Sequence, residues 1–323
     1  MKEKILKILQ EKGESTPAEI SEITGFSRQY VHRKLLELLE SDEIIKIGKP
    51  PLVFYQRKEI KSVLPEEEIS QEDRYLLGEK FIEITEDGSI LEGLSGFEHW
   101  CRKRNLPTAK TISEYHLTIE KYNKFRDQNG FIDGTDKIKN TKGMNDINLI
   151  SLFYLDFYAI ERFGKTLMGQ LLHFAKQGQN KKLSLRLIQL SIPKIHQLIE
   201  LLGVDAVGFI PPTIRRDVQF MTLLEKNLQI HIPKIKILKV KGEITVPQKA
   251  LSKIEDRVLN AQKSLIPIET RKFQKVLLID DAVGSGATLN ETARKMIKKD
   301  IGKEIYGLAI TGSFKGFEVI TEA

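Results

Sequence analysis

Two adjacent aspartates stand before a run of small residues near the carboxyl end of the chain, and together they could bind a polar, phosphorylated ligand. Asp280 and Asp281 are followed by the small-residue stretch 282–288, which contains two glycines, a serine and a threonine. Carboxylates accept hydrogen bonds from hydroxyl groups. A glycine-rich loop at a helix start presents backbone N–H groups to an anion, and the helix dipole adds to the attraction. These residue types therefore indicate a sugar phosphate, with its hydroxyls on the carboxylates and its phosphate on the loop.

The residues on either side predict the elements that must position this stretch. Residues 276–279 form an apolar run without polar alternation, as in a strand buried on both faces of a parallel sheet. The aspartates follow this strand, and residues 289–299 predict a helix after the loop. Ligands of open α/β sheets lie beyond the carboxyl ends of the strands, where both aspartates are expected. The alternative is a structural strand, loop and helix without a ligand, but two carboxylates beside such a loop are a poor choice for packing alone.

Residues 276–288 resemble the phosphoribosyl-pyrophosphate (PRPP) motif of type I phosphoribosyltransferases. The resemblance implies that the two aspartates bind the 2′- and 3′-hydroxyls of the ribose. It also implies that backbone N–H groups and two hydroxyl side chains of the following residues bind the 5′-phosphate. The implied PRPP site consists of Asp280, Asp281, Ala282, Val283, Gly284, Ser285, Gly286, Ala287 and Thr288. A Walker A loop is excluded, because no Gly-Lys-Ser or Gly-Lys-Thr follows.

The segment upstream resembles the ComF branch of the phosphoribosyltransferases, whose members carry Thr-Pro-Pro-Gln, Leu-Ser, Glu-Arg and Asn in this order. The matching positions of this chain are Gln248, Leu251, Ser252, Arg257 and Asn260. Residues 204–210 predict a strand, and Arg215 and Arg216 in the loop after it are expected to bind pyrophosphate through their guanidinium groups. The chain departs from the branch in two ways. It has no amino-terminal zinc ribbon, and Asp217 and Val218 replace residues of the branch's arginine-rich segment.

The resemblance also implies a chemistry. Pyrophosphate would leave the ribose C1, and Mg²⁺ would bridge the pyrophosphate oxygens to the sugar. We expect Mg²⁺ to be held mainly through PRPP and assign it no protein ligand. The residues do not name a catalytic base, so the presence of enzymatic turnover stays open.

The beginning of the chain predicts a second module. Residues 3–60 predict three helices and a hairpin, with Thr16 and Glu19 as a capping box and a Lys-Pro-Pro tip between the strands. This order resembles winged helix-turn-helix DNA-binding domains, which implies that the third helix, from Ser27 to about Leu39, enters the major groove. The candidate DNA-binding residues are Ser27, Arg28, Gln29, His32 and Arg33 on this helix and Lys49 on the wing. Dimerisation or protein docking is the alternative role for such a module.

The predicted fold class is α/β, with three parts. These are a winged helix-turn-helix over residues 1–60, a small α+β middle segment over 61–145, and a parallel-sheet type I phosphoribosyltransferase domain over 146–323. Within these parts we predict a loop or linker over residues 130–145, which are rich in Gly, Lys, Asn and Asp, and a helix over residues 163–178 that ends at a glycine.

Composition sets the remaining expectations. The chain has 323 residues, is 41% hydrophobic and 29% charged, and contains a single cysteine, Cys101. One cysteine forms no internal disulfide, and no apolar run approaches the roughly 20 residues of a membrane span, so we expect a cytoplasmic protein without membrane contact. The net charge of +7 permits a polyanionic partner such as double-stranded DNA. We also expect a homodimer, since both kinds of module commonly pair.

Two functional classes remain open from the sequence. One is a DNA-binding regulator that senses PRPP or a nucleotide, and the weakened arginine segment favours it. The other is an active Mg²⁺-dependent phosphoribosyltransferase acting on a base or on nucleic acid. A nucleotide-modifying effector of a defence system is a further, looser possibility.

Overall fold

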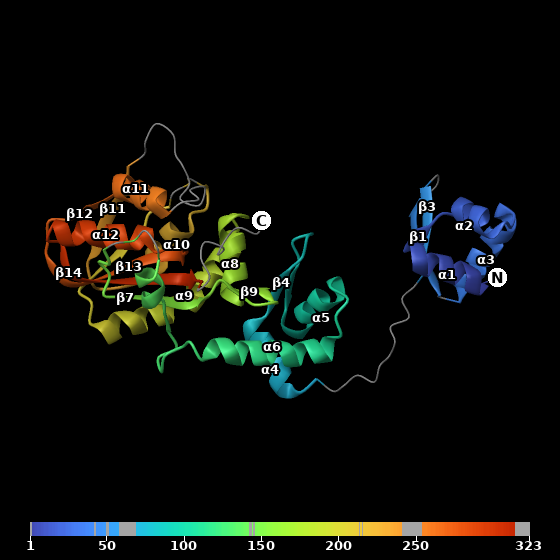
Figure 1. Cartoon of the computed structure of the whole chain (residues 1–323), viewed down its shortest axis with the longest axis horizontal. Coiled ribbons are helices and arrows are strands. Elements are labelled where there is room, and N and C mark those ends of the chain that lie inside the picture. Colours follow the sequence, from blue (N-terminus) through green and yellow to red (C-terminus); the bar gives the residue numbers. More distant parts are fainter. Residues whose placement is uncertain are drawn as a thin grey trace. The chain divides into compact units, whose positions relative to one another are not determined.

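The computed structural model describes residues 2–41, 43–49, 52–57, 69–141, 144, 146–212, 214, 216–240 and 254–313. The chain divides into two compact units, Met1–Glu68 and Ile69–Ala323 (Figure 1). The finer division into three domains stays a prediction. None of the described helices is long and apolar enough to cross a membrane.

The first unit packs three helices against a small antiparallel sheet of strand order β1-β3-β2. Its elements are α1 (Lys2–Lys12), β1 (Glu14–Ser15), α2 (Pro17–Thr24), α3 (Arg28–Glu40), β2 (Ile44–Lys49) and β3 (Leu52–Arg57). The predicted three helices and hairpin are therefore confirmed. The core of this unit is formed by Ile5, Leu9, Ile20, Val31, Leu35, Leu38, Ile44 and Tyr55.

Local hydrogen bonds explain where the two helices of the helix-turn-helix begin. The Thr16 N–H donates to Glu19 Oε2 at 2.7 Å, and the Glu19 N–H donates to Thr16 Oγ1 at 3.3 Å, which is the predicted capping box. Gly25 ends α2 with a left-handed φ of 73°. Ser27 then caps α3 by accepting the Tyr30 N–H at 3.4 Å. The turn between the helices is thus specified by its own residues.

The second unit is built around a seven-stranded sheet of order β12-β11-β10-β13-β14-β7-β6. The five central strands are parallel, and the two edge strands β12 and β6 are antiparallel to their neighbours. The strands are β6 (Ile132–Asp133), β7 (Ser151–Phe157), β10 (Ala206–Phe209), β11 (Lys234–Lys239), β12 (Leu265–Ile268), β13 (Phe273–Val283) and β14 (Gly302–Gly312). Strand β13 lies at the centre, between β10 and β14. The expected α/β class with a mostly parallel sheet is confirmed.

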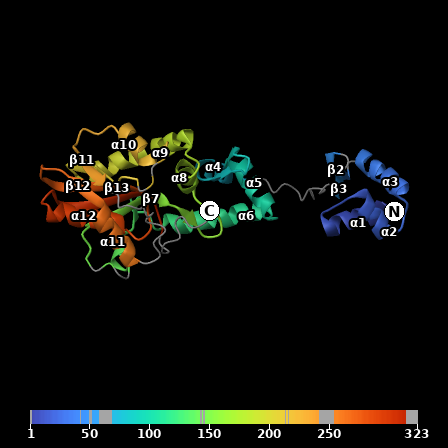
Figure 2. The same cartoon turned by 90° about the horizontal axis from the view of Figure 1, so that it is seen from above.

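Helices cover both faces of this sheet, as Figure 2 shows. On β13, Val276 and Leu278 join one hydrophobic cluster, while Leu277 and Ile279 join the other. All four side chains are buried, so the predicted strand with two apolar faces is confirmed. The first face carries α7 (Thr135–Lys139), α11 (Ile254–Ser264) and α12 (Ala287–Lys298), and the second carries α8 (Leu167–Lys176), α9 (Lys181–Leu202) and α10 (Phe220–Asn227).

The residues from 69 to 123 form a small α+β layer of the same unit. Its elements are α4 (Gln71–Lys80), β4 (Ile82–Ile84), β5 (Ile90–Glu92), α5 (Gly93–Lys103) and α6 (Thr108–Asn123). Aromatic rings connect this layer to the short hairpin of β8 (Ala159–Ile160) and β9 (Gly164–Lys165): the Phe163 ring lies 5.4 Å from Trp100 and 5.0 Å from Tyr115. The side chains of Trp100 and Cys101 are buried in the core of this unit.

Three predictions about element bounds need correction. The segment 130–145 is not a continuous loop, because it contains β6, which pairs with β7, and α7, whose Ile138 is buried. The helix predicted over 163–178 begins only at Leu167, since Thr166 caps it through the Gly169 N–H. Strand β13 does not end before the acidic residues but continues to Val283, because its pairing with β14 extends to Gly312. Tertiary contacts determine the first and the third of these bounds, and a local N-cap determines the second.

Candidate functional site

The acidic pair, Asp280 and Asp281, lies near the carboxyl end of β13, at the carboxyl edge of the parallel sheet. Both residues are only partly exposed. Asp280 Oδ1 accepts the N–H of Asp281 at 2.8 Å. Because the five parallel strands end at this same edge, the pair stands where residues from β7, β10, β11 and β14 also converge.

The glycine loop, residues 284–286, connects the acidic pair to α12. Gly286 is the N-cap of α12 with φ 79°. A Cβ atom at this position would lie 2.8 Å from Ile138 Cγ1 of α7, so α7 packs directly against the loop. The Ala287 N–H makes a long 3.4 Å hydrogen bond to Ser285 Oγ. The predicted PRPP residues therefore lie in three consecutive pieces: Asp280 to Val283 in β13, Gly284 to Gly286 in the loop, and Ala287 and Thr288 in the first turn of α12.

Helix α12 is fixed by contacts with an earlier segment. The Asn290 side chain is fully buried; its Oδ1 accepts the Asn148 N–H at 2.7 Å and its Nδ2 donates to the Asp146 carbonyl at 2.8 Å. Glu291, also buried, accepts from Arg294 Nε at 2.7 Å. These bonds hold the helix start in place beside the glycine loop.

Three lysines from other elements lie at this edge of the sheet. Lys176, in the last turn of α8, places its Nζ 2.7 Å from Asp281 Oδ1. Lys239, at the end of β11, is close enough to Asp280 to affect its charge state. Lys137, on α7, donates to the carbonyl of Ser313 just beyond β14. The edge therefore brings three lysines toward the acidic pair, and it also holds the ion pair of Asp156 on β7 with Arg126.

The charge states of these groups follow from burial and from one another. Burial raises the pKa of Asp280, and the neighbouring Asp281 charge raises it further, while Lys176 and Lys239 oppose both effects. Burial lowers the pKa of Lys137 to about 8. Burial also lowers the pKa of Lys239, against the opposing effect of Asp280. Two of the three amines, Lys137 and Lys239, thus lose their proton at a lower pH than a solvated lysine does.

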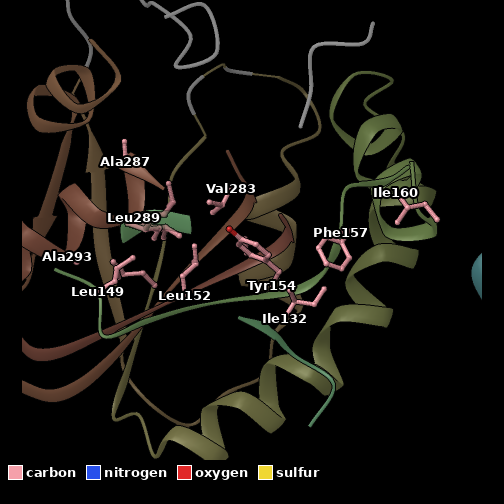
Figure 3. Close-up of a cluster of buried hydrophobic side chains, with 14 of the residues drawn as sticks. Ile132, Leu149, Leu152, Tyr154, Phe157, Ile160, Val283, Ala287, Leu289 and Ala293 are labelled. Atoms are coloured by element: carbon pink, nitrogen blue, oxygen red, sulfur yellow. The ribbon is translucent and has the colours of Figure 1, made fainter. Parts of the chain in front are cut away.

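Two buried hydroxyls near this edge have no hydrogen-bond partner among the described residues. They are Tyr154 Oη on β7 and Thr311 Oγ1 on β14. The ring of Tyr154 packs where Gly312 has no side chain, and its hydroxyl points toward Val283 (Figure 3). An unpaired buried hydroxyl costs free energy. The Tyr154 hydroxyl lies beside Gly134, where a Cβ atom would approach it to 2.6 Å.

The arginine loop, residues 211–219, follows β10 at the same edge. Arg216 Nη2 donates to Gln177 Oε1 at 3.3 Å, and the Asp217 N–H donates to Gln179 Oε1 at 2.9 Å. Arg215 lies outside the described residues, as do Gln248 and the Leu251–Ser252 match of the ComF-like signature. Arg257 and Asn260 lie in α11, and the side chain of Arg257 is outside the described part.

The predicted DNA-contacting residues lie together on the first unit. The side chains of Ser27, Arg28, Gln29, His32 and Arg33 are exposed around the start of α3, opposite the buried Val31 and Leu35. The Arg33 guanidinium lies 5.1 Å from the centre of the Tyr30 ring, and Tyr30 contacts Phe26 with ring centres 5.2 Å apart. Lys49 ends β2, and its side chain is outside the described part.

Sequence reasoning missed Lys137, Lys176, Lys239, Gln177 and Gln179. Each lies far along the chain from the motif that it contacts, so no local pattern marks it; Lys176 and Asp281 are separated by 105 positions. The position of Lys176 in the last turn of an amphipathic helix was the available signal, and it is shared by many solvated lysines.

Comparison with known proteins supports the first unit. Residues 1–46 match the family model of winged helix-turn-helix DNA-binding domains. A comparison with curated proteins gives no match. The chain thus carries a winged helix-turn-helix of the DNA-binding type ahead of an α/β unit with a mostly parallel sheet.

Proposed function

We propose that this chain is a DNA-binding regulator whose α/β unit binds PRPP or a related nucleotide. The observation that carries the proposal is the placement of the acidic pair, the glycine loop and the start of α12 in one stretch at the carboxyl edge of the sheet. A vicinal diol and a phosphate on one sugar match these two kinds of group.

In this proposal the acidic pair accepts hydrogen bonds from the ribose hydroxyls. The backbone N–H groups at the start of α12 bind the 5′-phosphate, because the first N–H groups of a helix lack partners within the helix. Gly286 allows the left-handed turn that aims them. Lys137 and Lys176 reduce the repulsion between an anionic ligand and the carboxylates.

The pyrophosphate would lie toward the arginine loop, where Arg216 is the described guanidinium. In the described part of the chain, no group of three or more acidic, histidine or cysteine side chains could hold a metal ion. We propose, from the resemblance to the PRPP motif, that Mg²⁺ would be held mainly through the ligand and would neutralise charge on its pyrophosphate.

The winged helix would bind DNA through α3. Exposed Arg28, Gln29 and Arg33 carry the donors and acceptors that base edges and phosphates require. Tyr30 holds the Arg33 guanidinium against its ring and so limits the freedom that DNA binding would otherwise remove.

The test is calorimetric titration of Mg²⁺-PRPP into the full chain. D280N/D281N is expected to lower the affinity at least about a hundredfold, since two charge-assisted hydrogen bonds weaken. The matched control is D300N, an exposed aspartate in the turn before β14, at the opposite edge of the sheet. Equal affinity in the wild type and in D280N/D281N would overturn the ligand assignment.

The same samples separate the two functional classes. Pyrophosphate release on addition of a base from a panel would identify an active phosphoribosyltransferase, and the effective base would identify the acceptor. Ligand binding without release is the result that the regulator predicts.

A further inference from the structure

The last turn of α8 approaches the acidic pair through one strong contact. Lys176 Nζ lies 2.7 Å from each carboxylate oxygen of Asp281. The side chains are 21% and 15% exposed, so water competes only weakly for this ion pair. Lys176 therefore fixes the plane of the Asp281 carboxylate, while the Asp281 N–H orients Asp280.

The residues that follow contact the arginine loop. Gln177 accepts a hydrogen bond from the Arg216 side chain, and Gln179 accepts one from the Asp217 N–H. We name residues 176–179 the α8 turn. It is one short segment that contacts both the acidic pair and the loop after β10.

The backbone of the α8 turn is strained at Gln179. Its φ is 48°, in the left-handed region that side chains rarely adopt. This conformation costs about 1 kcal/mol or more relative to glycine. Gln179 is exposed and connects α8 to α9, and Asn180 caps α9 by accepting the Leu183 N–H at 3.1 Å. The strained residue is one of the two whose side chains bind the arginine loop, which points to a positioning role.

We propose that the α8 turn is a positioning element that holds the acidic pair and the arginine loop at a fixed separation, so that both ends of one sugar pyrophosphate are bound together. The inference rests on the proposed function, because it assigns the two segments to the ribose and the pyrophosphate of one ligand. Such preorganisation lowers the entropy lost on binding.

The charge of the acidic pair gives a test that needs no ligand. Asp280 faces Asp281 from its own strand, Lys176 from α8 and Lys239 from β11. Since the Lys176 charge lowers the pKa of Asp280, its removal should raise the pH at which Asp280 ionises. An unchanged midpoint would mean that the Lys176 charge does not lie beside the acidic pair in solution.

The first experiment follows the Asp280 carboxyl carbon by NMR against pH in the ligand-free protein. K176M is expected to move the ionisation midpoint upward, and K176R to restore it. The control is K182M, which makes the same substitution at an exposed lysine in the first turn of α9. An identical midpoint in the wild type and K176M would overturn the role of Lys176.

The second experiment measures Mg²⁺-PRPP affinity by calorimetry together with thermal denaturation. K176M is expected to weaken binding about tenfold. Q179G should weaken binding about threefold while leaving the melting temperature equal or higher, because glycine removes the left-handed strain. The control N105G relieves the same kind of strain at φ 52°, in the turn after α5, and should not change affinity.

The double variant K176M/Q179G tests whether Lys176 and Gln179 act through the same element. Effects of substitutions that disrupt one shared element are not additive, so the Mg²⁺-PRPP affinity of the double variant should fall by less than the product of the two single fold-losses. Full additivity, or wild-type affinity in both single variants, would overturn the proposal. A wild-type chain that does not bind Mg²⁺-PRPP would instead overturn the proposed function, and the Asp280 titration would still decide the role of Lys176.

Discussion

The surface of α3 and the carboxyl edge of β13 are both polar, but they are assembled in different ways. The candidate DNA-binding residues of α3 lie within seven positions of one another and are exposed by the same periodicity that buries Val31 and Leu35. The residues around the acidic pair come from α7, α8, β11 and β13, and are partly buried. The first surface is therefore a local property of one helix, whereas the second depends on the whole sheet.

This difference has an energetic consequence. Substitutions on α3 should change binding with little effect on stability, because solvated side chains contribute little to folding. Substitutions at the edge should change both, because charges and close contacts there are partly removed from water.

The largest expected effect is at Gly286. G286A places a Cβ about one ångström too close to Ile138, at a position whose φ is 79°. We expect the free energy of unfolding to fall by about 3 kcal/mol, from left-handed strain and overpacking together. Urea denaturation followed by circular dichroism measures it.

G88A is the matched control for this substitution. Gly88 has φ 83°, but a Cβ there meets nothing within 4 Å. It should therefore cost only the strain, about 1 kcal/mol. Equal losses in both variants would show that α7 does not pack on the glycine loop.

Lys137 predicts a pH dependence of stability. Burial holds its pKa at about 8, below that of an unfolded lysine, so the unfolded chain binds more protons between about pH 8 and 10. Its contribution to the free energy of unfolding should therefore rise with pH across this window, by on the order of 2 kcal/mol. K137M should remove that rise, as measured by urea denaturation from pH 7 to 10. An identical pH profile in K137M would contradict burial of the amine.

The same amine should affect ligand binding in the opposite direction. Loss of its proton above about pH 8 removes a positive charge at the carboxyl edge of the sheet, so Mg²⁺-PRPP affinity should fall there in the wild type and less in K137M.

The next effect concerns α3. R28A/R33A should weaken binding to duplex DNA about tenfold and reduce the slope of log affinity against log salt, because fewer counterions are released. Fluorescence anisotropy at several salt concentrations measures both. K4A/K12A removes two exposed lysines from α1 as a charge-matched control. A loss of affinity that is equal in both variants would assign the effect to net charge rather than to α3.

The smallest effect is at the start of α2. T16A removes one half of the capping box and should cost about 1 kcal/mol of stability. A shift in the melting temperature by circular dichroism measures it, with S113A as a control on an exposed helical serine. No change in T16A would mean that the capping box is not formed in solution.

The contrast between the two regions also explains what the sequence could predict. The capping box and the start of the third helix at Ser27 depend on neighbours within four positions, and these predictions are confirmed. The buried strand β13 was predicted from an apolar run because both faces of a parallel strand must be apolar.

The surroundings of the acidic pair could not be predicted in the same way. Helix α7 has only five residues and lies in a polar stretch of the sequence, and its helical structure is stabilised by packing against Gly286. Lys176 contacts an aspartate that is distant in sequence, and Gln179 adopts a left-handed backbone that favours glycine. Only the assembled sheet brings these residues to one edge.

The most direct test of a ligand-sensing regulator is DNA affinity measured with and without Mg²⁺-PRPP. The probe is a duplex selected from a random library, and the measurement is fluorescence anisotropy at fixed salt. We predict that the ligand changes the affinity of the wild type at least about fivefold, and that D280N/D281N abolishes the change while binding the duplex equally well in the absence of ligand. Identical DNA affinity of the wild type with and without saturating ligand would contradict the regulator.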